Sequence, residues 1–409
     1  MKKLLATIVI VFLYCGFVFA EGQQEESLGQ IEVTLWTKAN EGDGSLQYVK
    51  DLAHEYHKQN QQVTIRVVNK SVEALREDFQ TESAADKGPD FLWTVNDHVR
   101  PFAEADIIQP IGDQINLDKF LESAVNGVKY DGEVWGVPIS SGNHITLLYN
   151  KSIITEPPET TKQLIEKSKE LTTGKQYGLV FSLDEPYFLA PWLYGFDGSF
   201  FEYDGHTPSL NSPAMVNALQ FFKDLKDKHK VLPENCNYER ADMYFMEGKA
   251  AMTINGAWKI DMYKKVLGED LGIARIPKIS ETQKWPQPLI SGISFMIAAD
   301  AKGTKRDVIM DFITYATNQQ NQIQQVKRLN RLPALKAALN DTVIQSNEIL
   351  YGLAEQVKVG TAMPIVLEMR CNWEAMRPEL KAVLENKKTP QEAAKAMQKS
   401  AESCVANQK

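Results

Sequence analysis

Short apolar segments and helical segments alternate along the chain, and this alternation limits the possible folds more than any other feature. The first strands are predicted at residues 31–36, 63–68 and 91–94, with helices between them at residues 45–58 and 72–85. Gly88-Pro89-Asp90 separates the second helix from the third strand. Such repeats predict an α/β domain with a largely parallel sheet.

The same alternation continues in the second half of the chain. The further strands are predicted at residues 145–149, 177–181, 250–254 and 292–299, and the further helices at residues 212–229 and 305–317. Asp131-Gly132 lies between two apolar stretches and predicts a β-hairpin. Thr389-Pro390-Gln391-Glu392 has the pattern of a capping box, so the last helix is predicted to begin there.

The N-terminal segment predicts secretion. Lys2 and Lys3 precede an almost wholly apolar run over residues 4–19, and Val18-Phe19-Ala20 offers a cleavage point. Residues 1–20 are therefore predicted to be a signal peptide, followed by a polar leader at 21–29. The mature protein is expected in the periplasm.

Two alternatives to a cleaved signal peptide are disfavoured. A membrane anchor needs about 20 apolar residues, and the run over residues 4–19 is shorter. Lipid attachment at Cys15 requires a small residue before the cysteine, and Tyr14 stands there instead.

Size and charge narrow the architecture and the partners. About 390 residues would remain after cleavage, which is too many for one hydrophobic core and predicts two domains. Cleavage removes two lysines and no acidic residue, so the formal charge of the chain changes from −8 to −10. An acidic surface argues against nucleic acids and anionic membranes as partners.

The cysteines and motifs indicate no metal or cofactor. Cys236, Cys371 and Cys404 follow the predicted cleavage site, which allows one disulfide at most and leaves a thiol over. Zinc spacing, a metal-ligand cluster, a nucleophile elbow and a phosphate-binding glycine loop are all missing from the sequence.

Four stretches together carry a resemblance to a known family. They are residues 88–93, residues 138–151, Glu185-Pro186-Tyr187-Phe188 and residues 251–258. In their order and separation, from about residue 31 to about residue 405, they resemble the maltose-binding protein family, the type-1 extracellular solute-binding proteins.

The resemblance implies an α/β fold of two lobes, the periplasmic-binding-protein fold, with a hinge and a ligand cleft between the lobes. The N-terminal lobe would consist of residues 30–140 plus 295–328. The C-terminal lobe would consist of residues 145–290 plus 333–409. Each lobe is therefore expected to be built from discontinuous pieces.

The resemblance also implies which residues hold a sugar. The matching positions are Asp97 in the first lobe, and Glu185, Tyr187, Trp258, Trp373 and Arg377 in the second. Aromatic rings can pack on the C–H faces of a pyranose, and charged groups make strong hydrogen bonds with its hydroxyls. From the residues alone, Asp97 could instead cap a helix, and each tryptophan could belong to a core.

The sequence departs from the maltose binders at several expected site positions. Asn40-Glu41 replaces their Asp-Lys pair after the first strand, Asn143 replaces a glutamate, and Thr94 replaces a tryptophan. Trp93 lies near an aromatic position of the family and is a further candidate. These differences leave the length and linkage of the sugar open.

The sequence therefore predicts a monomeric carrier that binds a carbohydrate, such as a maltodextrin, and delivers it to the membrane permease of an ABC transporter. No catalytic residue and no cofactor are expected. One alternative is a secreted glycoside hydrolase, although two carboxyl groups at a suitable separation are not evident. Another is a sugar-binding chemoreceptor component or adhesin.

Overall fold

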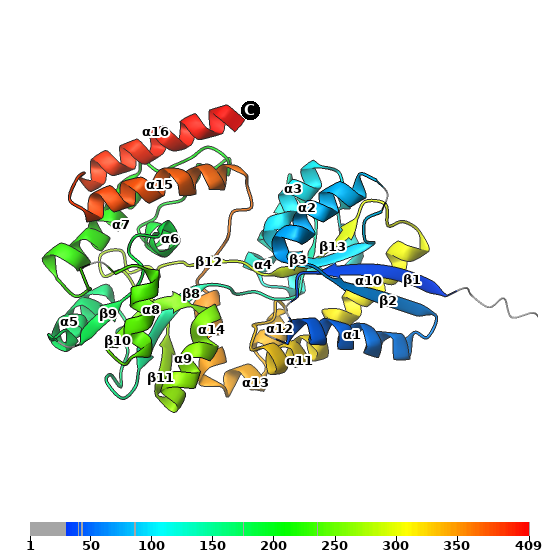
Figure 1. The fold of residues 1–409 in the computed structure, drawn as a ribbon, viewed down its shortest axis with the longest axis horizontal. Helices are drawn as coiled ribbons and strands as arrows, with labels where there is room; N and C mark the ends of the chain where they lie inside the picture. The colour runs from blue at the N-terminus through cyan, green and yellow to red at the C-terminus, as the bar shows by residue number, and fades with distance from the viewer. Residues whose placement is uncertain are drawn as a thin grey trace, which may run out of the picture.

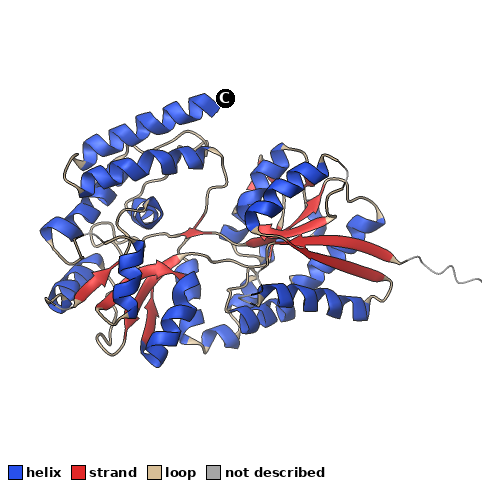
Figure 2. Cartoon of the chain, in the orientation of Figure 1, coloured by secondary structure: helices blue, strands red, loops and turns tan. Residues whose placement is uncertain are grey.

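The structure is a computed structural model that describes residues 30–39, 41, 44–85, 87–174, 176–234 and 236–408. The predicted signal peptide, the polar leader, Cys15 and Asn40 lie outside these residues. Two lobes lie side by side, each built around its own sheet, and several segments cross between them (Figures 1 and 2).

The first lobe contains a six-stranded sheet with the order β2-β1-β3-β13-β4, and β7 also pairs with β13. Its strands are β1 (Ile31–Thr37), β2 (Val63–Asn69), β3 (Phe91–Val95), β4 (Ile108–Gln109), β7 (Val137–Pro138) and β13 (Ile293–Ala298). β1 is parallel to β2 and to β3, as the alternation predicts, whereas β13 is antiparallel to β3.

Apolar residues on both faces of this sheet explain why helices cover both sides. Val33 and Leu35 of β1 face one buried cluster, and Trp36 faces another. The first face is covered by α1 (Ser45–Gln59), α10 (Thr304–Ala316) and α11 (Gln319–Leu329). The second is covered by α2 (Val72–Ser83) and α3 (Val99–Glu104) (Figure 1).

The second lobe contains a four-stranded sheet with the order β11-β8-β10-β9. Its strands are β8 (Ile145–Asn150), β9 (Tyr177–Val180), β10 (Ala250–Gly256) and β11 (Leu271–Ala274). The helices on one side are α5 (Thr161–Leu171), α6 (Pro186–Gly195), α7 (Pro213–Lys223), α15 (Glu368–Leu384) and α16 (Pro390–Gln408). Those on the other are α8 (Tyr238–Met246), α9 (Ile260–Leu267) and α14 (Glu348–Val357).

Short elements complete the chain. The short strands are β5 (Lys129–Tyr130), β6 (Glu133–Val134), β12 (Leu289–Ile290) and β14 (Thr361–Ala362). The short helices are α4 (Glu122–Asn126), α12 (Lys336–Leu339) and α13 (Thr342–Gln345). The 3-10 turns are Asn96–His98, Gly112–Gln114, Leu117–Lys119, Ala257–Lys259 and Gly268–Asp270, and Asp224–Lys228 extends α7 as a π-helical turn. No helix among the described residues is long and apolar enough to cross a bilayer.

Local predictions from turn and cap residues agree with the structure. Asp131 and Gly132 have φ values of 49° and 79°, and they connect the antiparallel strands β5 and β6. Before α16, the Thr389 amide donates to Glu392 Oε2 over 2.8 Å and the Glu392 amide donates to Thr389 Oγ1 over 3.2 Å. Both reciprocal hydrogen bonds of the capping box are therefore present.

Three segments of the hinge run between the lobes and bond to one another. Ser140 bridges to Pro333, and Gly142 bridges to Ser291. The amides of Gly142 and Ser291 donate to each other's carbonyl oxygens over 2.8 and 3.0 Å. These bonds make the hinge a small, ordered unit at the base of the interlobe space.

The three cysteines after the predicted cleavage site form one disulfide and leave one free thiol. Cys371 of α15 and Cys404 of α16 form a disulfide, and Cys236 is a buried free thiol. Because α15 and α16 pack on each other, the disulfide joins two neighbouring helices (Figure 1).

Candidate ligand-binding site

Three aromatic rings of the second lobe form a cluster that faces the interlobe space. The ring centre of Tyr187 lies 6.2 Å from that of Trp258 and 6.5 Å from that of Trp373. The rings come from α6, from the turn after β10 and from α15. Trp258 is 44% exposed, which is unusual for tryptophan and leaves a ring face available to a ligand.

Local backbone geometry explains why Trp258 lies across the end of β10. A Cβ atom on Gly256 would lie 2.1 Å from Trp258 Cε2, so only glycine allows the indole to approach the strand this closely. Trp258 Nε1 donates to the Tyr238 hydroxyl over 3.0 Å. The ring is therefore fixed at one edge while its face remains accessible.

Glu185 and Arg377 form a polar pair beside the aromatic cluster. Glu185 precedes α6, where Pro186 occupies the first turn, and Arg377 lies one helical turn beyond Trp373 on α15. Arg377 donates to Glu185 Oε1 over 3.0 Å. Both side chains are partly open to solvent, so the pair presents hydrogen-bond donors and acceptors next to the rings.

Asp97 of the first lobe faces this cluster from the other side of the cleft. It follows β3, at the carboxyl end of a parallel strand, where open α/β sheets commonly bind ligands. Asp97 is exposed to solvent. The surrounding protein nevertheless removes part of the hydration of the carboxyl group and so raises the pKa of Asp97, and a backbone hydrogen bond partly opposes this rise. Burial, and then the charge of Asp97, raise the pKa of Tyr187. The two residues are therefore within electrostatic reach of each other.

Asn143 connects the cluster to the hinge. Its Nδ2 donates to Ser291 Oγ over 3.1 Å, and its carbonyl oxygen accepts a hydrogen bond from the Tyr187 hydroxyl over 2.9 Å. The backbone of Asn143 is left-handed, with φ of 52°. A hinge residue thus holds one of the three rings in position.

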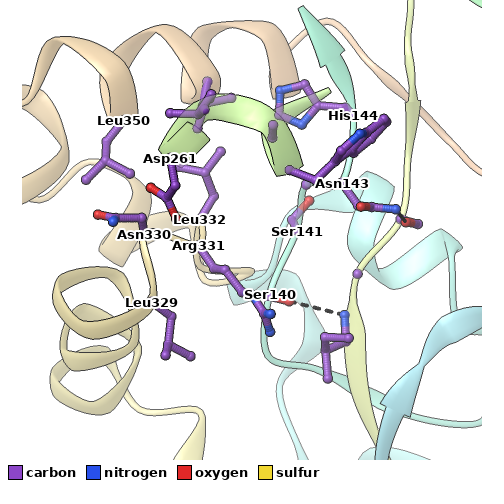
Figure 3. Close-up of a pocket in the computed structure, with 18 of the residues that line it drawn as sticks. Ser140, Ser141, Asn143, His144, Asp261, Leu329, Asn330, Arg331, Leu332 and Leu350 are labelled. Carbon is purple, nitrogen blue, oxygen red and sulfur yellow. Dashed lines mark hydrogen bonds between the residues drawn. The ribbon is translucent and has the colours of Figure 1, made fainter. Parts of the chain in front are cut away.

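A cavity of about 350 Å³ lies beside Trp258 at the hinge (Figure 3). Asn143 and Trp258 line it, as do residues that the sequence analysis did not identify. These include Lys38, Ser140, Ser141, Asp261, Lys264, Asn330 and Arg331. They belong to separate crossing segments, to α9 and, for Lys38, to the end of β1, so no local motif could have indicated that they share a cavity.

The remaining predicted residues lie elsewhere. Trp93 is 1% exposed and packs in the core of the first lobe, so a ligand cannot stack on it, and that expectation is wrong. Thr94 is also buried, with its Oγ1 3.0 Å from His98 Nδ1. Glu41 is exposed in the turn after β1, where its carbonyl oxygen accepts a hydrogen bond from the Gly44 amide. Within the described ranges, no cluster of His, Cys, Asp and Glu residues could hold a metal ion.

A family model described as bacterial extracellular solute-binding protein matches residues 51–351. The maltotriose-binding protein of Pyrococcus abyssi (strain GE5 / Orsay) is 28% identical over 375 residues, which cover 89% of this chain and 80% of that protein. The galactooligosaccharide-binding protein of Bacillus subtilis (strain 168) is 23% identical over 403 residues, covering 95% and 93%.

Solved structures of sugar-binding proteins share this fold. The maltose/maltodextrin-binding domain from Bdellovibrio bacteriovorus, bound to maltotriose, is 33% identical with a TM-score of 0.72, and the match covers 92% of this chain and 100% of that one. A cyclo/maltodextrin-binding protein complexed with maltotetraose has a TM-score of 0.86 at 24% identity, covering 94% and 100%. The predicted two-lobed fold and the predicted resemblance are confirmed. Because the family model spans most of the chain, this protein belongs to the bacterial extracellular solute-binding proteins, which bind ligands and are not enzymes.

Proposed function

We propose that this protein captures an oligosaccharide in the cleft between its lobes and delivers it to the membrane permease of an ABC transporter. The observation that carries the proposal is the cluster of Tyr187, Trp258 and Trp373, in which Trp258 is exposed, with charged hydrogen-bonding groups on both sides of it. Flat rings suit the C–H faces of sugar rings, and Asp97, Glu185 and Arg377 suit the hydroxyls.

A neutral oligosaccharide of the maltodextrin type is the ligand that we infer. Maltotriose is bound by the relative from Bdellovibrio bacteriovorus and named for the relative from Pyrococcus abyssi, whereas another relative is named for galactooligosaccharides. Asn143 stands where the maltose binders carry a glutamate, and Thr94 where they carry a tryptophan. We therefore expect the contacts with the sugar to differ from theirs.

Ligand binding is expected to favour closure of the two lobes. Asp97 belongs to the first lobe, whereas Glu185 and Trp258 belong to the second. A sugar that touches both sides binds the closed form better than the open form, and this difference is what drives hinge closure. In the proposed cycle, the closed monomer docks on the permease after secretion to the periplasm and removal of residues 1–20.

A thermal-shift screen of residues 21–409 tests this function. The panel contains maltodextrins of increasing length, galactooligosaccharides, monosaccharides, polyols and amino acids. A ligand that binds only the native state raises the melting temperature, so a rise with one class of oligosaccharide is expected. A rise with amino acids or polyols and none with any sugar would contradict the proposal.

A further inference from the structure

The three rings of the aromatic cluster are held in place in different ways. Trp258 donates a hydrogen bond to the Tyr238 hydroxyl, and Tyr187 donates one to the carbonyl oxygen of Asn143. The indole nitrogen of Trp373 makes no hydrogen bond with any residue that the structure describes, and the ring is instead in contact with other aromatic rings. The orientation of the Trp373 indole therefore depends on packing.

Phe200 provides the buried surface against which Trp373 packs. Phe200 is 0% exposed, and its ring centre lies 5.2 Å from that of Trp373, with an angle of 67° between the ring planes. Edge-to-face contacts of this kind favour one relative orientation of two rings. Phe200 also contacts Tyr194 of α6, with the ring centres 5.7 Å apart. One phenyl ring thus contacts both α6 and α15.

A hydrogen bond joins Phe200 to the residue that precedes Trp373. Asn372 Nδ2 donates to the carbonyl oxygen of Phe200 over 3.1 Å, and the Ser209 amide donates to the same oxygen over 3.0 Å. The side chain of Asn372 is fully buried, as is that of Phe200. Two consecutive residues of α15 are therefore attached to Phe200, one through its ring and the other through its amide group.

Phe200 joins the two helices that carry the second-lobe part of the site. Glu185 and Tyr187 lie at the start of α6, whereas Trp373 and Arg377 lie on α15. The two helices pack on each other in the second lobe (Figure 1). A residue that contacts both helices helps to set the separation between Tyr187 and Trp373, whose ring centres are 6.5 Å apart.

We propose that Phe200 and Asn372 are positioning residues for sugar binding. Both are buried, so they act through Trp373, whose indole they hold in the orientation on which a sugar ring packs. Binding groups must keep their geometry closely, and buried neighbours that fix their rotamers are what maintains it. The inference rests on the proposed function and makes it more specific.

A double-mutant cycle tests whether Phe200 acts through Trp373. Phe200→Leu removes the ring edge and leaves space behind the indole. We expect this variant to raise the dissociation constant of maltotriose about fivefold, as measured by isothermal titration calorimetry. In the Trp373→Ala background the same substitution should have almost no effect on the dissociation constant. Tyr187 and Trp258 remain in that background, so binding stays measurable.

A second variant and a matched control separate positioning from a general loss of stability. Asn372→Ala removes the hydrogen bond to Phe200 and should also weaken binding only while Trp373 is present. Phe222→Leu is the control, because Phe222 is fully buried in the same core but its ring contacts Phe181 and Trp192. It should lower the melting temperature as Phe200→Leu does and leave the dissociation constant unchanged.

Three results would overturn the inference while the proposed function stands. In the first, the folded Phe200→Leu and Asn372→Ala variants bind maltotriose as the wild type does. In the second, Phe200→Leu weakens binding by the same factor with and without Trp373. In the third, Phe222→Leu weakens binding as much as Phe200→Leu. If the folded wild type binds no sugar at all, the proposed function fails, and the inference fails with it.

Discussion

At the scale of single residues, Trp258 has the greatest effect that we predict on ligand binding. Its exposed face borders both the aromatic cluster and the cavity. Replacing Trp258 with alanine removes the indole surface that borders the cluster and the cavity. Truncation of such an aromatic anchor costs about 2–4 kcal/mol of binding free energy. We expect Trp258→Ala to raise the dissociation constant roughly 30-fold or more, as measured by calorimetry with maltotriose.

Trp285 offers a matched control for this measurement. It is another partly exposed tryptophan of the second lobe, but its ring lies against Arg275 and Lys278 and not at the cleft. Trp285→Ala should leave the dissociation constant almost unchanged. Equal losses for the two variants would show that Trp258 acts only through stability.

Two buried histidines predict how stability depends on pH. Burial lowers the pKa of His144 to about 4, with an opposing effect from the backbone of Leu353. Burial, and then the positive charges of Arg76 and Lys38, lower the pKa of His98 to about 4. In the unfolded chain both titrate near 6.5. Unfolding therefore takes up protons between about pH 4 and 6.5, and acid destabilises the native state over that range.

The expected loss can be measured by urea unfolding at pH 7.5 and pH 5. Each buried histidine should lower the free energy of unfolding by about 2 kcal/mol over this interval. His144→Leu should abolish its share, because leucine does not titrate. His54→Gln, at an exposed position, should leave the pH dependence as it is. The prediction fails if His144→Leu has the same pH dependence as the wild type.

At the scale of elements, the α15–α16 pair supports the binding site from behind. α15 carries Trp373 and Arg377, and the disulfide between Cys371 and Cys404 joins it to α16. The disulfide links two cysteines with a sequence separation of 33. Removal of a disulfide that closes a loop of this length should lower the free energy of unfolding by about 3–4 kcal/mol.

Denaturation with and without reductant measures this contribution. Cys404→Ser should unfold at lower denaturant concentration than the wild type, and reductant should have no further effect on it. Below its unfolding transition the variant should still bind ligand, because Ala375, Met376 and Leu380 keep α15 in the core. Cys236→Ala, which removes the free thiol, should remain sensitive to reductant. Equal stability of the oxidised and reduced wild type would contradict the prediction.

At the scale of the whole molecule, an ion pair between Arg100 and Glu368 joins the lobes. Arg100 of α3 donates to Glu368 of α15 over 2.6 Å, and their side chains are 9% and 14% exposed. Arg100 also donates to Glu104 over 2.7 Å, and His206 lies 3.6 Å from Glu368. Burial by itself raises the pKa of Glu368, but the hydrogen bond from Arg100, a backbone hydrogen bond and the charges of Arg100 and His206 together outweigh burial and lower this pKa. A buried pair of this kind is far less screened than a surface pair.

Removal of this pair should shift the lobes apart. Glu368→Gln is expected to increase the radius of gyration of the ligand-free protein in small-angle X-ray scattering. It should also weaken ligand binding about tenfold, since the ligand then has to drive more of the closure.

Glu348→Gln is the control for this prediction, because Glu348 pairs with Lys151 within the second lobe. It should change neither the radius of gyration nor the affinity. If Glu368→Gln behaves like this control, the interlobe pair contributes nothing to closure.

Much of the local structure follows from the sequence by itself. β1, α1, β2 and β8 begin at the predicted residues or within one of them, because periodicity and chain-breaking residues act over a few positions. The hairpin at Asp131-Gly132 and the capping box at Thr389 depend on backbone preferences of single residues. The rings and charges expected at the site came from family resemblance. Tyr187, Trp258 and Trp373 lie together, as do Glu185 and Arg377, whereas Trp93 does not join them because its strand is buried on both faces.

The tertiary structure decided what lies together across long separations. β13 pairs with β3, which lies about two hundred residues earlier in the chain, Cys371 pairs with Cys404 rather than with Cys236, and Arg100 contacts Glu368. The cavity beside Trp258 collects Ser141, Asp261 and Asn330 from segments with no shared motif. These arrangements depend on the burial of apolar surface over the whole chain. Burial depends on which faces meet in space, and the periodicity of a single segment cannot determine that.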